Sequence, residues 1–158
     1  MPSTTIGSAR SWVIGYGNPH RRDDGIGIHV VESLRKSVEP REEVFIHAFH
    51  QLEPVLIDEL QDADSIIFVD ATVEVLKEGF GWVEVQPEKR NLPFITHHLT
   101  PSVLLGLLQS LYHRSPPTWL VSVQGEDFGF GEGLSVEAAE RAERASRKIA
   151  DFISVKID

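Results

Sequence analysis

The amino-acid sequence predicts a three-layer α/β/α sandwich built around a mainly parallel, twisted sheet of about five strands. Short apolar runs alternate along the chain with segments of helical periodicity, which is the pattern of βαβ units. The chain has 158 residues, of which 41% are hydrophobic and 25% charged, the balance of an ordinary globular domain. We find no internal repeat or long linker in it, and therefore expect a single domain over residues 1–158.

The first βα unit lies near the N-terminus. Residues 11–16 form an apolar run that predicts a strand, and residues 17–25 form a polar, glycine-containing turn. Apolar side chains then recur at helical spacing, which predicts the first helix. They are Ile26, Val30, Val31 and Leu34.

The next two strands are predicted from residues 44–46 and 65–70. The helix between them is marked by apolar residues at Leu52, Val55, Leu56 and Leu60. Pro54 is compatible with this helix only in its first turn. The run 65–70 is apolar until it ends in Asp70, as expected of a central strand that is buried on both faces.

The second half of the chain continues the pattern. Residues 81–85 alternate between apolar and polar, which predicts a half-exposed strand and makes it a candidate for antiparallel pairing. Thr100 and Pro101 predict the start of a helix, because threonine caps helices and proline suits their first position. Residues 119–123 predict the last strand, and Ser135 is expected to cap a long C-terminal helix.

Charge and cysteine content exclude several classes of function. The net charge is −9, which opposes binding to nucleic acid or to anionic lipid. The basic run 141–148 contains interleaved glutamates and is interpreted as a solvated helix face. There is no cysteine, so disulfides, thiolate metal sites and a cysteine nucleophile are excluded. No apolar run approaches the length of a membrane span, and we expect a reducing cytoplasm as the location.

Three groups suited to metal binding follow predicted strands or precede a predicted helix. Asp23 and Asp24 lie in the turn after the first strand, Asp70 ends the third, and His97 and His98 precede the helix that begins near Thr100. Ligands of open parallel sheets gather at the C-terminal ends of the strands, so the topology brings these groups to one edge. Two carboxylates and an imidazole suit divalent ions such as nickel or zinc. Such an ion polarises a carbonyl and activates water, which predicts peptide-bond hydrolysis.

Each of these residues also has a purely structural interpretation. Asp23 or Asp24 would then cap the first helix, Asp70 would be a turn residue, and one of the histidines would lie at the surface. The glycines at 15 and 17 would mark only a tight turn. Nucleotide binding is disfavoured, because two carboxylates after these glycines would repel a pyrophosphate.

Four segments, in order, resemble the nickel–iron hydrogenase maturation endopeptidases. Residues 15–27 resemble the family's Gly-x-Gly-Asn motif, which is followed by an acidic pair and Gly-x-Gly. Residues 63–71 resemble its apolar strand ending in Asp-Ala, and residues 96–107 its histidine-containing helix entry. Residues 133–135 are similar to the segment before its last helix. The resemblance covers nearly the whole chain and implies the sandwich fold.

The resemblance also implies the site residues. The metal ligands and catalytic residues would be Asp24, Asp70 and His97, with His98 as the competing assignment. Asp24 stands where relatives often carry Glu, so its reach is shorter by about 1 Å. The stretch 20–22, His-Arg-Arg, departs from the apolar residues of many relatives, so local substrate contacts are expected to differ. His50 is given no catalytic role.

The implied reaction removes the C-terminal extension of a hydrogenase large-subunit precursor. The nickel would be carried by this substrate, the enzyme having no tightly bound cofactor of its own, and zinc or cadmium would substitute in vitro. Cleavage would report that nickel has been loaded. Two alternatives remain: a peptidyl-tRNA hydrolase, suggested by residues 15–19 alone but opposed by the acidic charge, and a non-catalytic chaperone that checks the precursor for nickel.

Overall fold

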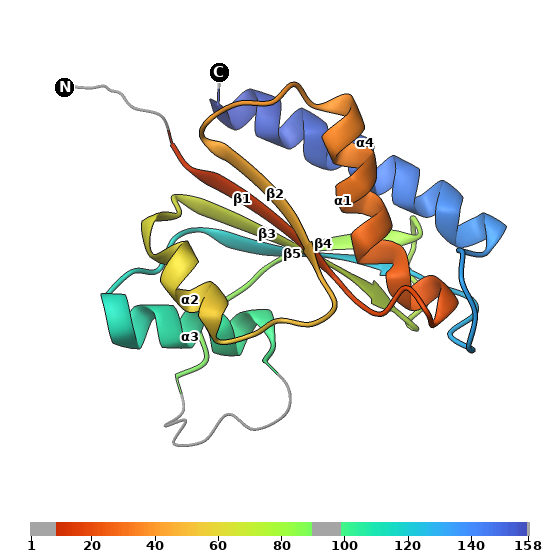
Figure 1. The fold of residues 1–158 in the computed structure, drawn as a ribbon, viewed down its shortest axis with the longest axis horizontal. Helices are drawn as coiled ribbons and strands as arrows, with labels where there is room; N and C mark the ends of the chain where they lie inside the picture. The colour runs from red at the N-terminus through yellow and green to blue at the C-terminus, as the bar shows by residue number, and fades with distance from the viewer. Residues whose placement is uncertain (1–8, 90–98, 158) are drawn as a thin grey trace.

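The computed structural model describes residues 9–89 and 99–157. Its centre is a five-stranded sheet in the order β2-β1-β3-β5-β4, in which β4 alone runs antiparallel to its neighbour (Figure 1). The expected mainly parallel sheet and the antiparallel strand are thereby confirmed. The strands are β1 (Ser11–Tyr16), β2 (Val44–Phe49), β3 (Ser65–Thr72), β4 (Phe80–Glu84) and β5 (Thr118–Gln124).

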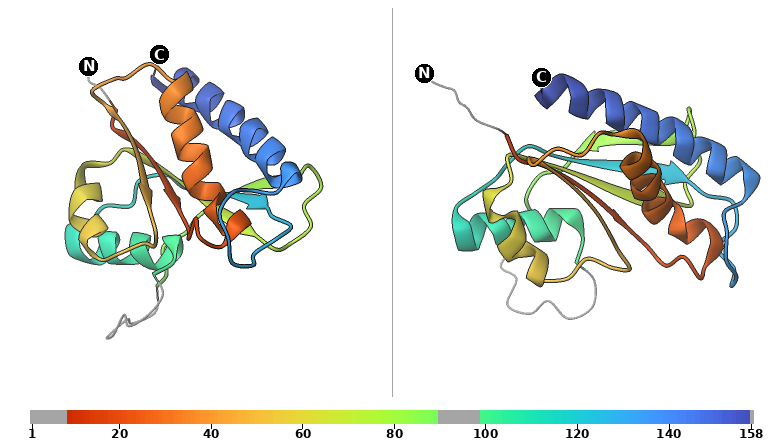
Figure 2. Two further views of the ribbon diagram at one scale, coloured as in Figure 1. Left: turned by 45° about the vertical axis from the view of Figure 1, so that its right-hand side comes forward. Right: turned by 45° about the horizontal axis from the view of Figure 1, so that its top comes forward.

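Helices cover both faces of the sheet, which confirms the three-layer sandwich (Figures 1 and 2). One face carries α1 (Ile26–Ser37) and α4 (Val136–Ile157). The other carries α2 (Val55–Glu59) and α3 (Pro101–Tyr112). In the parts of the chain that are described, no helix is long and apolar enough to cross a membrane.

The alternation of β3 decides which face each side chain occupies. Ile67 and Val69 belong to the core beneath α1 and α4, whereas Ile66 and Phe68 belong to the core beneath α2 and α3. Burying Phe68 completely contributes about 1.5–3 kcal/mol relative to an exposed position. Asp70 follows Phe68 by two residues and therefore projects on the α2–α3 side.

Several boundaries differ from the expectation by one to three residues, and two of the differences change how a residue is placed. The second helix was expected to include Leu52, but α2 begins at Val55, with Pro54 as its N-cap, and continues only as a 3-10 turn to Asp62. Leu52 is nevertheless buried, because it reaches the core from the loop before the helix. Asp70 was expected to end its strand, but β3 continues for two more residues to Thr72.

The N-terminal ends of both long predicted helices are confirmed. The hydroxyl of Thr100 accepts a hydrogen bond from the Val103 amide at 3.2 Å, and Pro101 occupies the first position of α3. The hydroxyl of Ser135 accepts one from the Ala138 amide, also at 3.2 Å, at the start of α4. Each serves an amide that would otherwise lack a partner in the first turn.

The start of α1 lies so close to the sheet that a glycine is required. A Cβ on Gly27 would lie 2.5 Å from the carbonyl oxygen of Val69 and 2.7 Å from that of Tyr16. Any side chain would push α1 away from the ends of β1 and β3. The contact fixes the turn between β1 and α1, which carries the acidic pair, next to the end of β3.

Candidate functional site

The two carboxylates Asp24 and Asp70 come together at the C-terminal edge of the sheet. Asp24 lies in a 3-10 turn (Arg22–Gly25) after β1, and its Oδ2 accepts a hydrogen bond from the Asn18 amide at 2.8 Å. The turn is tight enough that a Cβ on Gly17, whose φ is +147°, would lie 2.0 Å from the Asp24 carbonyl oxygen. Asp24 is near enough for its charge to act on the ionisation of Asp70.

Asp70 is half-buried and its ionisation is perturbed. Burial raises its pKa from 3.8 to about 6, and the charge of Asp24 acts in the same direction. Two hydrogen bonds oppose this: the Ala71 amide donates to Oδ1 at 2.8 Å, and the Tyr16 hydroxyl donates to the carboxylate. A carboxylate with a pKa near 6 is ionised at neutral pH, yet its charge is incompletely solvated. Such a group is suited to receiving a cation.

Tyr16 is a residue of the site that the sequence interpretation missed. Burial, the charge of Asp70 and the hydrogen bond to it raise the pKa of Tyr16, so the hydroxyl remains a donor. The signal was present in the alternation of β1, since Tyr16 follows Ile14 by two residues and both lie on the α2–α3 side. Tyr16 is the variable position of the Gly-x-Gly motif, so the motif itself gives it no role.

Asp23 has a structural role that differs from that of Asp24. Its side chain is fully buried, and its Oδ2 accepts hydrogen bonds from the amides of Glu126 and Asp127 at 2.7 and 2.9 Å. The amide and hydroxyl of Ser135 donate to the same carboxylate, each at 2.7 Å. Burial alone would raise the pKa of Asp23, but these hydrogen bonds outweigh it and lower the pKa. Asp23 therefore joins the turn after β1 to the loop between β5 and α4.

The interpretation of Asp23 or Asp24 as a helix cap is wrong. The N-cap of α1 is Gly25, which makes no side-chain cap bond. The carboxylate of Asp23 bonds a different loop, and that of Asp24 bonds Asn18.

Arg21 and Arg22, in the stretch that differs from the related family, contact the loop between β5 and α4. The Arg21 guanidinium donates to the Phe128 carbonyl at 3.1 and 3.2 Å and lies 5.3 Å from the ring centre of Phe130. Arg22 forms an ion pair with Asp127 at 3.6 Å. Phe130 is 86% exposed, so this loop presents an aromatic side chain to solvent beside the arginine.

The histidines complete the list of expected site residues. His97 and His98 both lie outside the described residues, three and two positions, respectively, before the cap of α3 at Thr100. Within residues 9–89 and 99–157, no group of three or more histidine, aspartate or glutamate side chains is arranged to hold a metal ion. The described part of the site therefore supplies two carboxylates. His50 is exposed and follows the C-terminal end of β2, at the same edge of the sheet.

Comparisons with known proteins found solved structures with a similar fold. No protein-family model and no curated protein matches the chain, but solved structures do. It is similar to the NiFe hydrogenase maturation protease HycI from Thermococcus kodakarensis, with 25% identity, a TM-score of 0.70 and 94% of each chain covered. It is also similar to the hydrogenase maturating endopeptidase HybD from E. coli, with 20% identity, a TM-score of 0.75 and 93% of each chain covered. A hydrogenase 2 maturation peptidase from a Thaumarchaeota archaeon has 20% identity and a TM-score of 0.67, over 92% of this chain and 98% of that one.

Proposed function

Since the chain has the fold of the hydrogenase maturation proteases, and the resemblance seen in its sequence is thereby confirmed, we propose that it is an endopeptidase of hydrogenase maturation. Its substrate is the nickel-loaded precursor of a hydrogenase large subunit, from which it removes the C-terminal extension. The reaction takes place in the cytoplasm. The proposal takes the substrate class from the similar proteins and the site from this chain.

The observation that carries the proposal is the pairing of Asp24 with Asp70. The two carboxylates approach closely enough for one to raise the pKa of the other, at an edge of the sheet where ligands of such folds bind. A divalent cation relieves this repulsion, because it is attracted to both negative charges. His97, from the segment before α3, supplies the third ligand, with His98 as the alternative.

The nickel belongs to the substrate in this proposal. Nickel held by Asp24, Asp70 and His97 polarises the scissile carbonyl and lowers the pKa of a nearby water. The residues of the chain orient this arrangement: Asn18 holds Asp24, and Tyr16 holds Asp70. A precursor without nickel presents no cation to the carboxylates and is not cut. Zinc or cadmium would occupy the same ligands in vitro, since affinity alone does not select nickel.

The test is cleavage of purified large-subunit precursor, with and without nickel, followed by mass spectrometry of the products. The wild-type protein should release a C-terminal peptide from the nickel-loaded precursor only. Asp24→Asn, Asp70→Asn and His97→Ala should each reduce the rate at least a hundredfold, as expected for loss of a group that acts on the reacting atoms. Asp62→Asn makes the same change at an exposed aspartate in the 3-10 turn before β3, and this matched control should leave the rate unchanged.

Two results would contradict the proposal in different ways. Full processing by all three site variants would show that the site is elsewhere. A stable complex with the nickel-loaded precursor that is never cleaved would identify the chain as a nickel-checking chaperone instead.

A further inference from the structure

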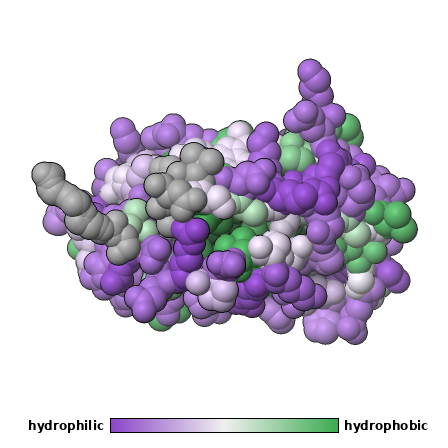
Figure 3. Space-filling model, turned by 90° about the horizontal axis from the view of Figure 1, so that it is seen from above, coloured by the Kyte–Doolittle hydropathy of each residue, from purple (hydrophilic) through white to green (hydrophobic). Residues whose placement is uncertain are grey.

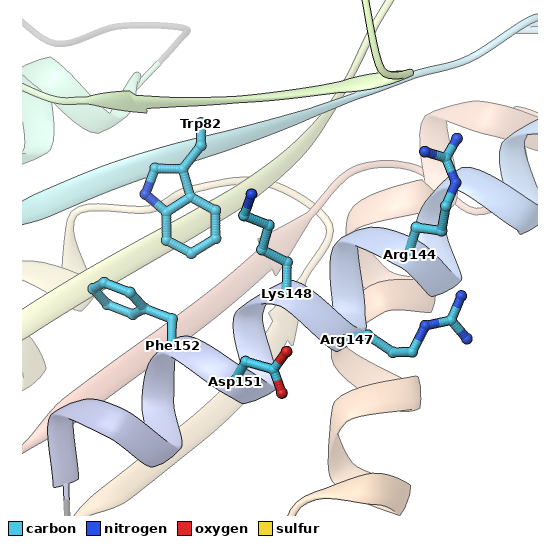
Figure 4. Close-up of a pocket in the computed structure, with 6 residues that line it drawn as sticks. All are labelled: Trp82, Arg144, Arg147, Lys148, Asp151 and Phe152. Carbon is cyan, nitrogen blue, oxygen red and sulfur yellow. The ribbon is translucent and has the colours of Figure 1, made fainter.

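A groove lined by α4 and β4 lies away from the two carboxylates. It has a volume of about 850 Å³ and is lined by Trp82 from β4 and by five residues of α4 (Figure 4). Trp82 belongs to the core beneath α1 and α4, on the opposite face of the sheet from Asp70. The groove is therefore separate from the candidate site. Its lining residues are Trp82, Arg144, Arg147, Lys148, Asp151 and Phe152.

The floor of the groove is aromatic. The rings of Trp82 and Phe152 lie with their centres 5.2 Å apart, and Phe152 also packs edge-on against Trp119 at 5.1 Å. Trp82 and Phe152 are half-buried, so part of each ring faces the groove. An apolar side chain of a ligand would gain contact area there without displacing the core.

Positive charge lines the wall of the groove, although the whole chain has a net charge of −9. Arg144 is engaged internally, since it pairs with Glu140 at 2.6 Å and donates to the Glu78 carbonyl at 2.9 Å. Arg147 and Lys148 are exposed and form no ion pair with any residue in the described ranges. Asp151 is the one acidic residue of the lining. Seen from the side of α1 and α4, the surface is largely hydrophilic with small hydrophobic areas (Figure 3).

Beside this groove runs an edge strand whose outer backbone groups face away from the sheet. The Gln124 amide bonds to the Gly79 carbonyl at 2.9 Å, and the Val85 amide to the Thr118 carbonyl at 2.8 Å. In an antiparallel pair, hydrogen-bonded positions alternate, so the odd-numbered residues of β4 bond to β5. The N–H and C=O groups of Phe80, Trp82 and Glu84 therefore point outward, where no described strand pairs with them.

We propose that β4 and the α4 groove bind an extended acidic peptide segment of a protein partner, which adds to the sheet as a sixth strand. Backbone hydrogen bonds to β4 would hold about five residues, the length of this strand. A large apolar side chain of the peptide rests on Trp82 and Phe152, and acidic side chains meet Arg147 and Lys148. Charge complementarity selects an acidic partner for this groove, because the protein as a whole is negatively charged and repels an acidic peptide elsewhere.

This surface deepens the proposed function, on which it rests for the identity of the partner: the peptide would be a segment of the precursor outside the cleaved bond. β4 runs antiparallel to β5, so its Phe80 end lies at the edge of the sheet that carries Asp70. A segment held along β4 thus leads toward the edge where cleavage is proposed.

The binding test uses synthetic peptides and so is independent of proteolysis. A fluorescein-labelled peptide of sequence Thr-Glu-Thr-Phe-Thr-Glu, whose phenylalanine and glutamates share one face of an extended strand, is titrated with the protein, and fluorescence anisotropy is measured at low and high salt. The wild-type protein should bind it, and Lys148→Glu should weaken binding at least fivefold. Lys36→Glu makes the same change at an exposed lysine of α1 and should bind like the wild type. Deuterium exchange should show new protection at the amides of Trp82 and Glu84, with little change at Val83.

Three results would overturn the proposal. One is an acidic peptide that the wild-type protein does not bind. Another is equal binding by the Lys148→Glu and Lys36→Glu variants. The third is equal binding of a control ligand: a Thr-Lys-Thr-Phe-Thr-Lys peptide would show that negative charge is not recognised, and a single-stranded oligonucleotide would show that the peptide backbone is not. If peptide binding holds but the precursor is not cleaved, the docking surface stands and the proposed protease function fails.

Discussion

Replacing Asp70 by asparagine should stabilise the protein at neutral and alkaline pH. The folded state raises the pKa of Asp70 from 3.8 to about 6. Above pH 6 the carboxylate is ionised in both states, but its charge is less favourable in the fold. The difference corresponds to at most about 3 kcal/mol, at 1.36 kcal/mol for each pKa unit. Asparagine keeps one oxygen, which accepts from the Ala71 amide as Oδ1 does.

The sign of the pH dependence follows from proton binding. Between pH 4 and 6 the folded wild-type protein binds more protons at Asp70 than the unfolded chain does, so its stability falls as pH rises through this window. The neutral asparagine has no such dependence. Asp70→Asn should therefore exceed the wild type by about 1–3 kcal/mol at pH 8, the lower figure allowing for partial solvent exposure, and the difference should vanish near pH 4.

Urea unfolding at pH 8, 6 and 4.5 measures this difference directly. The matched control is Asp151→Asn, an exposed carboxylate of α4, which should change stability by no more than about 0.5 kcal/mol at any pH. The reasoning is refuted if Asp70→Asn is no more stable than the wild type at pH 8, or if its advantage is the same at pH 4.5. A gain in stability together with loss of processing would mark Asp70 as a residue retained for function.

Three other substitutions probe the supports of the site. Asp23→Ala should cost about 3 kcal/mol or more, because it leaves three amides and a hydroxyl without their acceptor; urea unfolding measures the loss, and amide exchange confined to residues 126–135 would locate it. Gly27→Ala should destabilise the protein by at least about 2 kcal/mol, because its Cβ would lie 2.5 Å from a backbone carbonyl oxygen. In the control Gly81→Ala, the Cβ meets nothing closer than 3.7 Å, so the change should be nearly neutral. Equal thermal stability of these two variants would contradict the packing argument. Tyr16→Phe removes a hydrogen bond that lowers the pKa of Asp70, so the acid limb of the processing rate should move to higher pH; an unchanged pH profile would show that this bond does not tune Asp70.

The strands were predictable because each is a short apolar or alternating run with its own turn signals. β3 shows this most clearly, since its first five residues are buried and helices cover it on both faces. The second helix was predicted less well, because Leu52 has the spacing of a helical residue but is buried from a loop. Periodicity indicates which side chains are buried, and it does not by itself show which local backbone buries them.

The same division holds for the site. The approach of Asp24 to Asp70 follows from topology, because the turn after β1 and the C-terminal part of β3 lie at the same edge of two adjacent parallel strands. The different roles of Asp23 and Asp24 do not follow, since neighbouring carboxylates look alike until Glu126, Asp127 and Ser135 are brought to one of them. The α4 groove was likewise hidden: the basic run was interpreted as a solvated face, and only the structure shows which of its cations are paired.

The hydrogen bonds of Asp23 to the loop between β5 and α4 also bear on when the site is completed as the chain is synthesised. Asp23 and Ser135 are 112 residues apart in the chain, so their hydrogen bonds close one of the longest loops in the molecule. Contacts of such sequence separation form late, after the loop-closure entropy has been overcome. On the ribosome, packing of Gly27 seats the turn against β1 and β3, but the bonds of Asp23 are complete only after Ser135 has emerged and α4 has begun to pack. A nascent chain should therefore complete its candidate site only in the last stage of translation, so that, under the proposed function, incomplete chains should show no detectable cleavage.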